Sequence, residues 1–376
     1  MSLKHYAVLG LFLCLLGIPL RGHAQDRLGF DGDDLVTPDC AAMSDWFECR
    51  SINDPSVNAS VRRGYEYIHH TTSTLGPDAP RNETNTFEDG TAYANASIAC
   101  SSCHFTGGHV PFGTPFYQVP DKYASKPYFR PLNYNRDAAD SILDCFSNCM
   151  NNPRTPPKDD PVIQDMLAYI QWVADGVTDP SMKGAGWPTL PGHGLPVIPG
   201  VATMTANPAA GATIYANDCA GCHSDDGPGQ GEYRSDESRP RVPALWGVNS
   251  YTRGAAFYNN QNLGAFVRQF MPYGDPLTLS NQQALDVASF INQQGHPDGL
   301  ADQMFCHIEA DNIPASLRKP AAANVGCTYP GEPFNSTQIM NGPWAPITAW
   351  RNAEIARLLN GMRGVNPGIN LLLNDN

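Results

Sequence analysis

The sequence lacks a long internal apolar run and has little positive charge. After residue 20, no segment approaches about 18 uninterrupted apolar residues, so the mature chain is expected to have no membrane span. Its 24 Lys and Arg stand against 37 Asp and Glu, which gives a formal net charge of −13. A surface of that sign repels phosphate backbones, so nucleic acid is not expected as a partner, whereas basic redox proteins are favoured.

The apolar stretch at the N-terminus predicts a secretory signal peptide. Lys4 and His5 make a basic start before the apolar residues 6–20, and residues 22–24 end on the small Ala24 that a signal peptidase prefers. We expect residues 1–24 to be removed. The mature protein is therefore predicted to be periplasmic or extracellular.

Two copies of a Cys-x-x-Cys-His pattern carry the clearest chemistry. They are Cys100-Ser-Ser-Cys103-His104 and Cys219-Ala-Gly-Cys222-His223. In such a pattern the two thiols bond to the haem vinyl groups, and the adjoining histidine ligates the iron. The alternative is a zinc or dithiol site, which would need a second Cys/His pair that neither copy has nearby. The sequence therefore predicts a cytochrome with two covalently bound haem c groups.

Length and composition predict two small domains with extensions. A cytochrome c unit needs only about a hundred residues, and 34 Gly with 33 Pro indicate long connections. We expect a mainly α fold with two cytochrome c-type haem domains, long irregular loops and N- and C-terminal extensions. The expected boundaries are 1–24 for the signal peptide, 25–61 for the N-terminal extension, 62–183 for the first cytochrome c domain, 184–206 for the linker, 207–298 for the second cytochrome c domain and 299–376 for the C-terminal extension.

Three segments carry clear helix signals. Residues 207–219 have the spacing of an amphipathic helix that leads into the second haem motif. Residues 280–294 open with a Ser-x-x-Gln capping box and should pack across that helix. In the first half, Asp160 caps a helix that begins at Pro161 and ends at Gly176. Each half is thus expected to have a haem motif followed by a closing helix.

Each iron needs a sixth ligand unless it is left open for chemistry. For the second haem we expect Met271, which lies just before the closing helix. Methionine ligation favours ferrous iron, so this haem is the expected exit for electrons. The carbonyl of Pro243 is expected to hold the His223 ring. For the first haem the candidates are Cys145, Cys149, Met150, His69 and His70.

Several short sequence segments resemble those of the diheme thiosulfate dehydrogenases and occur in the same order along the chain. In the first half they are Gly64-Tyr65-Glu66-Tyr67-Ile68, Thr74-Leu75-Gly76-Pro77, the haem motif, Ile142-Leu143-Asp144-Cys145 and residues 166–172. In the second half they are residues 244–247, 250–251, 254–255, 271–272, 284–291 and 296–297. The resemblance covers about residues 62–297.

The resemblance implies a reaction and a ligand. In the family, the first haem has His/Cys ligation and lies on the substrate side, while the second passes electrons to an external acceptor. Cys145 falls on the family's axial cysteine. The implied reaction couples two thiosulfates to tetrathionate and releases two electrons, or runs in reverse. A small sulfur oxyanion is therefore the expected substrate, and a redox protein such as a small cytochrome c is the expected partner.

Two positions near Cys145 depart from the family. Ser141 stands where the family usually has a basic residue, and Cys149 stands where it usually has serine. Two dianions a few ångströms apart repel by several kcal/mol in a partly desolvated site, so cationic neutralisation is needed. Arg130 and Arg136 are the candidates for it. Together with Cys145 and Cys149, they are the predicted catalytic residues.

Cys149 leaves two interpretations open. On a helix, the α-carbons of Cys145 and Cys149 would lie about 6 Å apart, within disulfide range but with parallel side chains. A disulfide would remove the thiolate ligand and leave the iron to His69 or His70. Otherwise Cys149 is a thiol beside the first haem that could hold a sulfur adduct.

The remaining cysteines and the C-terminal segment are assigned structural roles. Cys40 with Cys49 and Cys306 with Cys327 are expected as local disulfides in an oxidising compartment, although other pairings stay open. Residues 349–362 predict one helix, whose apolar face would comprise Trp350, Ile355, Leu358 and Leu359.

Three functional classes remain open from the sequence. An enzyme of the thiosulfate dehydrogenase type requires an accessible anion pocket at a Cys145-ligated haem. A diheme electron carrier would have both irons sealed. A subunit of an extracellular cytochrome assembly would use the extensions to stack haem edges between chains.

Overall fold

The computed structural model describes residues 46–48, 50–77, 79–81, 85–120, 128–130, 134–179, 194–227, 242–273, 275–298 and 332–365. The predicted signal peptide lies outside the described residues, as do most of the two extensions and part of the linker. The two expected disulfides also involve only residues outside them, namely Cys40, Cys49, Cys306 and Cys327.

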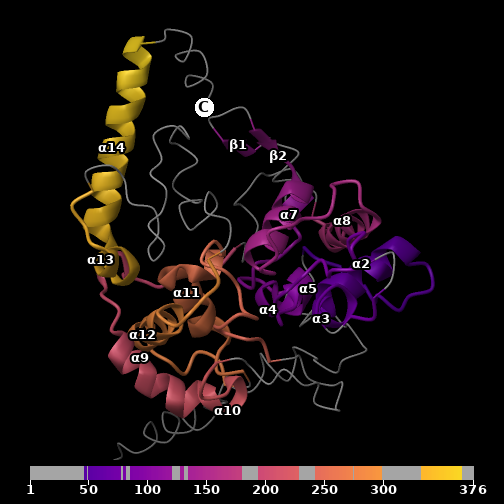
Figure 1. Cartoon of the computed structure of the whole chain (residues 1–376), viewed down its shortest axis with the longest axis horizontal. Helices are drawn as coiled ribbons and strands as arrows, with labels where there is room; N and C mark the ends of the chain where they lie inside the picture. The colour runs from indigo at the N-terminus through magenta and orange to yellow at the C-terminus, as the bar shows by residue number, and fades with distance from the viewer. Residues whose placement is uncertain are drawn as a thin grey trace, which may run out of the picture.

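The described chain is mainly helical, which confirms the predicted fold class (Figure 1). The helices of the first half are α2 (Ala59–His69), α3 (Thr71–Thr74), α4 (Cys100–Cys103), α5 (Phe105–Gly108), α7 (Ala138–Asn148) and α8 (Pro161–Ala174). Those that follow are η1 (Val201–Thr203), α9 (Pro208–Ile214), η2 (Tyr215–Cys219), α10 (Ala220–His223), η3 (Ala256–Tyr258), α11 (Asn260–Phe270), α12 (Asn281–Asn292), α13 (Ser336–Asn341) and α14 (Trp344–Val365). The short antiparallel pair β1 (Tyr128–Arg130) and β2 (Tyr134–Arg136) was not predicted from the sequence.

Two helix crossings have the same geometry, one in each half. Helix α2 crosses α8 at Gly64, where an added Cβ would lie 2.0 Å from the carbonyl oxygen of Asp165. Helix α9 crosses α12 at Gly211, where an added Cβ would lie 2.0 Å from the carbonyl oxygen of Asp286. In both crossings the helix backbones touch directly, which only glycine permits. The halves thus share an architecture, and the predicted packing of the closing helix across α9 is confirmed.

The predicted helix starts are confirmed, and one helix differs. The Asp160 carboxylate accepts a hydrogen bond from the Val162 N–H at 2.9 Å, with Pro161 at the first position of α8. Ser280 caps α12 through the expected capping box with Gln283. The helix predicted over residues 207–219 is α-helical only to Ile214 and then widens into the π-turn η2. Single π-turns often mark functional sites, and this one ends at the first cysteine of the second motif.

The two halves share one hydrophobic cluster. The ring of Phe105, next to the first motif, packs on Phe270 of α11 with ring centroids 4.6 Å apart. At the end of α7, the Thr252 N–H donates to the carbonyl of Asn148 at 2.8 Å. In Figure 1, α4 and α7 accordingly lie beside α11. Side-chain packing and main-chain hydrogen bonds therefore fix the halves against each other.

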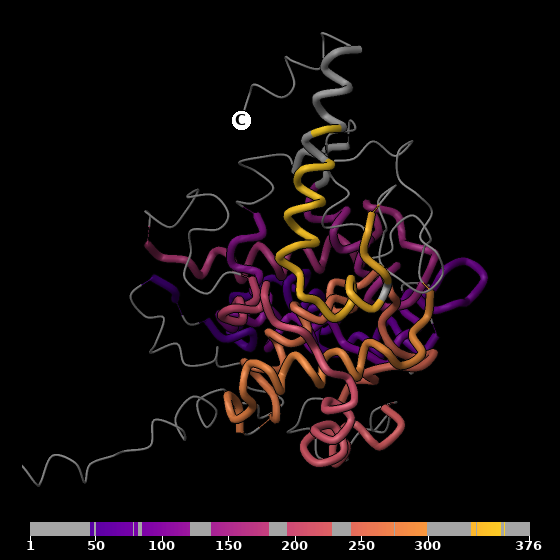
Figure 2. Tube along the Cα trace, turned by 90° about the vertical axis from the view of Figure 1, so that its left-hand side faces the viewer, coloured from indigo at the N-terminus to yellow at the C-terminus, as the bar shows by residue number. Residues whose placement is uncertain are grey.

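Helix α14 runs away from the rest of the chain in two perpendicular views (Figures 1 and 2). It is anchored at its start by buried Trp344 and Ile347, and Arg351 pairs with Glu332 at 2.7 Å. The predicted helix over residues 349–362 is therefore part of a longer one. The two buried apolar side chains that anchor the helix precede Trp350, which is itself only half-buried. The side chains of Ile355, Leu358 and Leu359 lie outside the described part. No described helix, α14 included, is both long and apolar enough to cross a membrane.

The crossings predict a stability effect. Gly211→Ala places a methyl group against the Asp286 backbone and should lower the free energy of unfolding by about 1–3 kcal/mol, because the helices must separate. The measurement is denaturant unfolding of the haem-loaded protein followed by circular dichroism. Gly295→Ala is the matched control, because nothing lies within 4 Å of its added Cβ. Equal unfolding midpoints for the two variants would contradict the close crossing.

Candidate functional site

The first haem motif lies on a helix of four residues, which is held in place by a residue from another part of the chain. Cys100 and Cys103 bound α4, and His104 is its C-terminal cap residue. The N–H of Cys100 donates to Oγ1 of fully buried Thr71 at 3.0 Å, and the same oxygen lies 3.4 Å from Cys100 Sγ. Thr71 thus fixes the first attachment cysteine against the turn that follows α2.

The ring of His104 is oriented by a main-chain carbonyl. Its Nδ1 lies 2.6 Å from the carbonyl oxygen of Thr114, and the ring packs on Phe116 at 4.4 Å between centroids. Burial lowers the pKa of His104, and the hydrogen bond that its ring makes to the Thr114 carbonyl offsets part of that shift. A neutral ring that donates Nδ1–H to the carbonyl leaves its Nε2 lone pair available for iron. Thr114 was not predicted from the sequence, because a main-chain carbonyl has no signature in a residue pattern.

The second motif repeats this arrangement. Cys219 ends the π-turn η2, and Cys222 and His223 lie on α10. Nδ1 of His223 lies 3.1 Å from the carbonyl oxygen of Pro243, which confirms the expected contact. Burial again lowers the pKa of the histidine. Both motifs therefore present a neutral imidazole with its Nε2 free.

Cys145 of α7 lies beside the first motif. Burial raises the pKa of Cys100 to about 12 and also raises that of Cys103. The second contribution to both shifts is the nearby thiol of Cys145. The structure therefore brings the predicted axial cysteine together with both predicted attachment cysteines, although they lie more than 40 residues apart in the chain.

Cys145 also touches Cys149. Their Sγ atoms lie 2.7 Å apart, and both residues are half-buried free thiols. The two sulfurs are thus in direct contact, at a separation longer than the about 2.05 Å of a disulfide bond. The contact with Cys149, together with burial, raises the pKa of Cys145 well above its usual value.

The other candidates for the first iron make different contacts. Nε2 of His69 lies 3.2 Å from the Tyr169 hydroxyl. The ring of His70 pairs with Glu66 at 3.9 Å. The side chain of Met150 is buried in the shared cluster. Of these candidates, Cys145 is the one whose thiol acts on the pKa of both attachment cysteines.

Met271 is the C-terminal cap residue of α11, directly after Phe270. Its half-buried thioether packs against the shared cluster, and its N–H donates to the Val267 carbonyl at 2.9 Å. No described hydrogen bond joins Met271 to His223. The helix end fixes the place from which the thioether would reach an iron.

The two predicted arginines lie in the β-hairpin that precedes α7. The register places Arg130 opposite Tyr134 and Arg136 opposite Tyr128. Arg136 comes directly before the cap residue of α7, about two helical turns ahead of Cys145. The backbone thus carries both arginines on the segment that leads to Cys145, while their side chains lie outside the described part.

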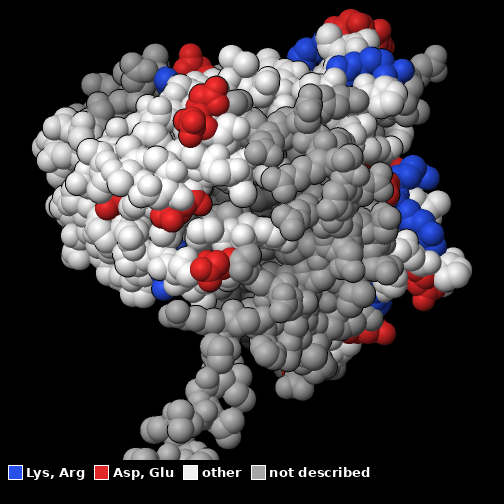
Figure 3. All heavy atoms as spheres, turned by 90° about the horizontal axis from the view of Figure 1, so that it is seen from below, with Lys and Arg blue, Asp and Glu red and all other residues white. Residues whose placement is uncertain are grey.

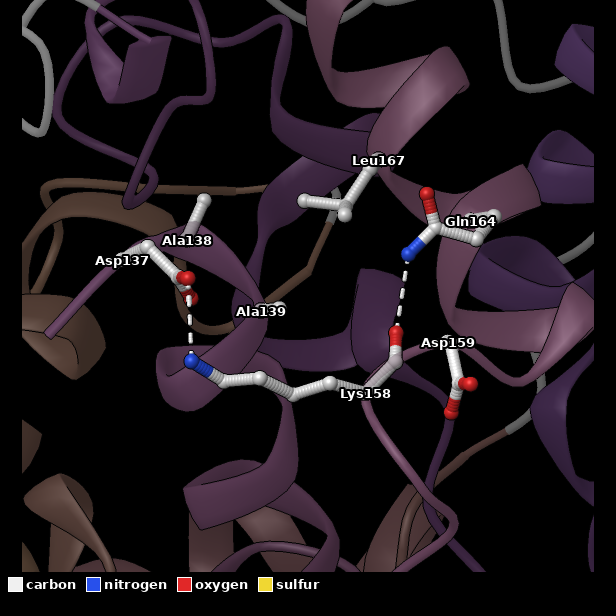
Figure 4. A pocket seen from close by; sticks show the side chains of 7 residues that line it. All are labelled: Asp137, Ala138, Ala139, Lys158, Asp159, Gln164 and Leu167. Atoms are coloured by element: carbon white, nitrogen blue, oxygen red, sulfur yellow. Dashed lines mark hydrogen bonds and ion pairs between the residues drawn. The ribbon is translucent and has the colours of Figure 1, made fainter.

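A pocket of about 350 Å³ lies between the N-terminal ends of α7 and α8 (Figure 4). Lys158 in its wall pairs with Asp137 at 2.9 Å and with Asp140 at 2.7 Å, and Asp159 also lines it. Because carboxylates outnumber the single ammonium group, this pocket does not suit a dianion. The face in Figure 3 also shows described acidic side chains scattered among uncharged residues.

The donors fit a haem c better than a bare metal ion. Within the described ranges, no group of three or more His, Cys, Asp or Glu residues is placed to hold a metal ion. A haem iron receives four equatorial nitrogens from its porphyrin and needs only one or two donors from the protein. Each motif supplies those needs with two thiols for attachment and one oriented imidazole.

Comparisons with known proteins agree with this chemistry. The family model for cytochrome c matches residues 208–295. Thiosulfate dehydrogenase of Stutzerimonas stutzeri is 32% identical over 211 residues, which are 54% of this chain and 62% of that protein. The thiosulfate dehydrogenase of Allochromatium vinosum is 28% identical over 293 residues, which are 75% of this chain and 91% of that protein. The chain thus spans less than two thirds of the Stutzerimonas stutzeri relative.

A solved structure is similar as well. Thiosulfate dehydrogenase (TsdBA) from Marichromatium purpuratum, in its as-isolated form, matches with a TM-score of 0.51 and 25% sequence identity. The match covers 66% of this chain and 49% of that one. The chain is therefore a c-type cytochrome, a class that carries covalently bound haem c, and it resembles the thiosulfate dehydrogenase family.

Proposed function

We propose that this protein is an exported diheme cytochrome c that couples two thiosulfates to tetrathionate at the first haem, or runs the reverse reaction. The observation that carries the proposal is the position of Cys145 beside Cys100 and Cys103. Its relatives named thiosulfate dehydrogenase supply the substrate class.

The chain's own residues would divide the work at the first haem. Cys100 and Cys103 would hold the group by thioether bonds, and His104 would bind the iron through Nε2. The Cys145 thiolate would be the second axial ligand, since thiolate donation stabilises ferric iron. Each haem, when bound, accepts or donates one electron. Two such groups match the two electrons that leave when a sulfur–sulfur bond forms between two thiosulfates.

The second haem would be the exit for electrons. His223 and Met271 are its proposed axial ligands, with Cys219 and Cys222 as attachment residues. A thioether ligand raises the reduction potential relative to thiolate, so electrons would flow from the first haem to the second. The net charge of −13 favours a basic acceptor, such as a small cytochrome c.

Arg130 and Arg136 are proposed to neutralise the substrate dianions. Ser141, half-buried on α7 one turn before Cys145, brings no charge of its own. The hairpin arginines are the cations on the chain segment that leads into that helix. Cys149 is proposed as a further catalytic thiol.

The export route and the domain limits belong to the same proposal. Residues 1–24 would direct the chain to the periplasm or outside the cell. Residues 62–183 and 207–298 would form the two haem domains, and the match over residues 208–295 supports the second. The pairs Cys40–Cys49 and Cys306–Cys327 would pin the extensions by disulfides.

The alternative is a diheme electron carrier, or a subunit of an extracellular cytochrome assembly, without substrate chemistry. The absence of a basic side chain at Ser141 favours the carrier, and the projecting helix α14 favours assembly. Haem reduction by the substrate separates these alternatives from the enzyme.

Thiosulfate should reduce the haems of the purified mature protein and yield tetrathionate, whereas Cys145→Gly should do neither. The variant removes the sulfur that lies beside the attachment cysteines. The measurement combines visible spectra of both haems with a tetrathionate assay. Reduction of both proteins by a chemical reductant is the control for haem loading. If that reductant works and thiosulfate reduces neither protein, the enzyme assignment is wrong.

Met271→Leu should lower the reduction potential of one haem and leave the other unchanged, because a thioether ligand is lost at similar side-chain volume. A spectroelectrochemical titration resolves the two potentials. Met204→Leu is the matched control, since Met204 packs in the smaller cluster around Trp344. Unchanged potentials in Met271→Leu would remove Met271 as a ligand.

A further inference from the structure

We propose that Cys145 and Cys149 act together as a two-electron dithiol that exchanges with sulfur–sulfur bonded oxyanions such as tetrathionate. The proposal rests on the proposed function for its substrate class. It adds a catalytic partner to Cys145 at a position where the related enzymes usually have serine. The observation behind it is the direct contact of the two Sγ atoms at 2.7 Å.

The end of α7 holds the two thiols together. Cys149 is the C-terminal cap residue, and its N–H and that of Met150 both donate to the Cys145 carbonyl at 2.8 Å. The preceding carbonyl, that of Asn148, accepts the Thr252 N–H from the second half. The last turn of α7, which carries both sulfurs, is therefore fixed by hydrogen bonds of its own backbone and by one from the second half of the chain.

The two thiols are able to bond to each other. Residues four apart on a helix have α-carbons about 6 Å apart, which lies inside the range for a disulfide. Their parallel side chains keep such a bond from ideal geometry, and bonds of that kind are more readily reduced. In the disulfide state Cys145 would no longer be an iron ligand, so a turnover cycle needs a disulfide that is readily reduced.

The first exchange step breaks the central bond of tetrathionate. The Cys145 thiolate attacks one of the two inner sulfurs, so that the adduct Cys145 Sγ–S–SO3⁻ forms and one thiosulfate leaves with the bonding electron pair. The thiol proton goes to solvent. No oxidant besides tetrathionate is needed.

The second step forms the disulfide and releases the second thiosulfate. The Cys149 thiolate attacks Sγ of the adduct, so that a Cys145–Cys149 disulfide forms and the second thiosulfate leaves. Together the two steps oxidise one dithiol by two electrons and reduce one tetrathionate to two thiosulfates. In the oxidative direction both steps run backwards, and the dithiol then loses two electrons to the two ferric c-type haems of the proposed function and two protons to solvent.

The test mixes tetrathionate with the haem-loaded protein after its thiols have been reduced, the reductant removed and the haems shown by their spectra to be ferric. Wild type should release two thiosulfates per chain and yield a Cys145–Cys149 disulfide in a non-reducing peptide map. Cys149→Ser should release half as much and retain one S–SO3⁻ group on Cys145, because the resolving thiol is missing. Cys149→Ala is a second variant, and incubation without tetrathionate shows whether the disulfide needs it.

Two results would overturn the dithiol. One is thiosulfate release by wild type with both thiols unmodified, which assigns the electrons to the haems alone. The other is a Cys149→Ser protein that is reduced by thiosulfate as wild type is and holds no adduct.

The experiment distinguishes a failure of the dithiol proposal from a failure of the proposed function. Disulfide formation with tetrathionate, in a protein whose haems thiosulfate does not reduce, would keep the dithiol and reject the dehydrogenase. Haem reduction by thiosulfate in wild type and Cys149→Ser alike, without a disulfide, would do the opposite.

Discussion

A helix of four residues cannot hold its own shape in water, and the first haem motif lies on such a helix. The second motif lies at the end of the continuous helical run from α9 through η2 to α10. Groups outside each motif contact it. Thr71 holds Cys100, and the carbonyls of Thr114 and Pro243 hold the two histidine rings. The first motif is linked to the crossing at Gly64, because Thr71 lies two residues after the end of α2, and the second to the crossing at Gly211, because η2 continues α9.

The same dependence explains why the first half needs the second. The cysteine contact lies on the last turn of α7, and the carbonyl just before Cys149 is bound by Thr252 of the other half. Tyr251, the residue before Thr252, is buried near Cys103, and its hydroxyl donates to Asn292 of α12. Residues of the second half therefore form part of the surroundings of the first motif.

The sequence predicted those elements whose signals are local. The helix caps at Asp160 and Ser280 were identified because a cap is a side chain next to its own helix. Helix α2 was missed, although Asn58 caps it, because that asparagine was not weighed as a cap. The Thr114 carbonyl and the Cys145–Cys149 contact could not be predicted, since the first has no side-chain signature and the spacing of the second allowed a disulfide equally well.

The aromatic contact between Phe105 and Phe270 links the chain neighbours of two proposed iron ligands. Phe105 follows His104 in the chain, and Phe270 precedes Met271. A substitution that moves either ring shifts the backbone beside a proposed ligand in its own half and presses on the neighbour of a ligand in the other. The halves are thus not interchangeable modules. A foreign unit grafted in place of either one would have to bring a matching aromatic ring, so the two halves are coupled through this contact.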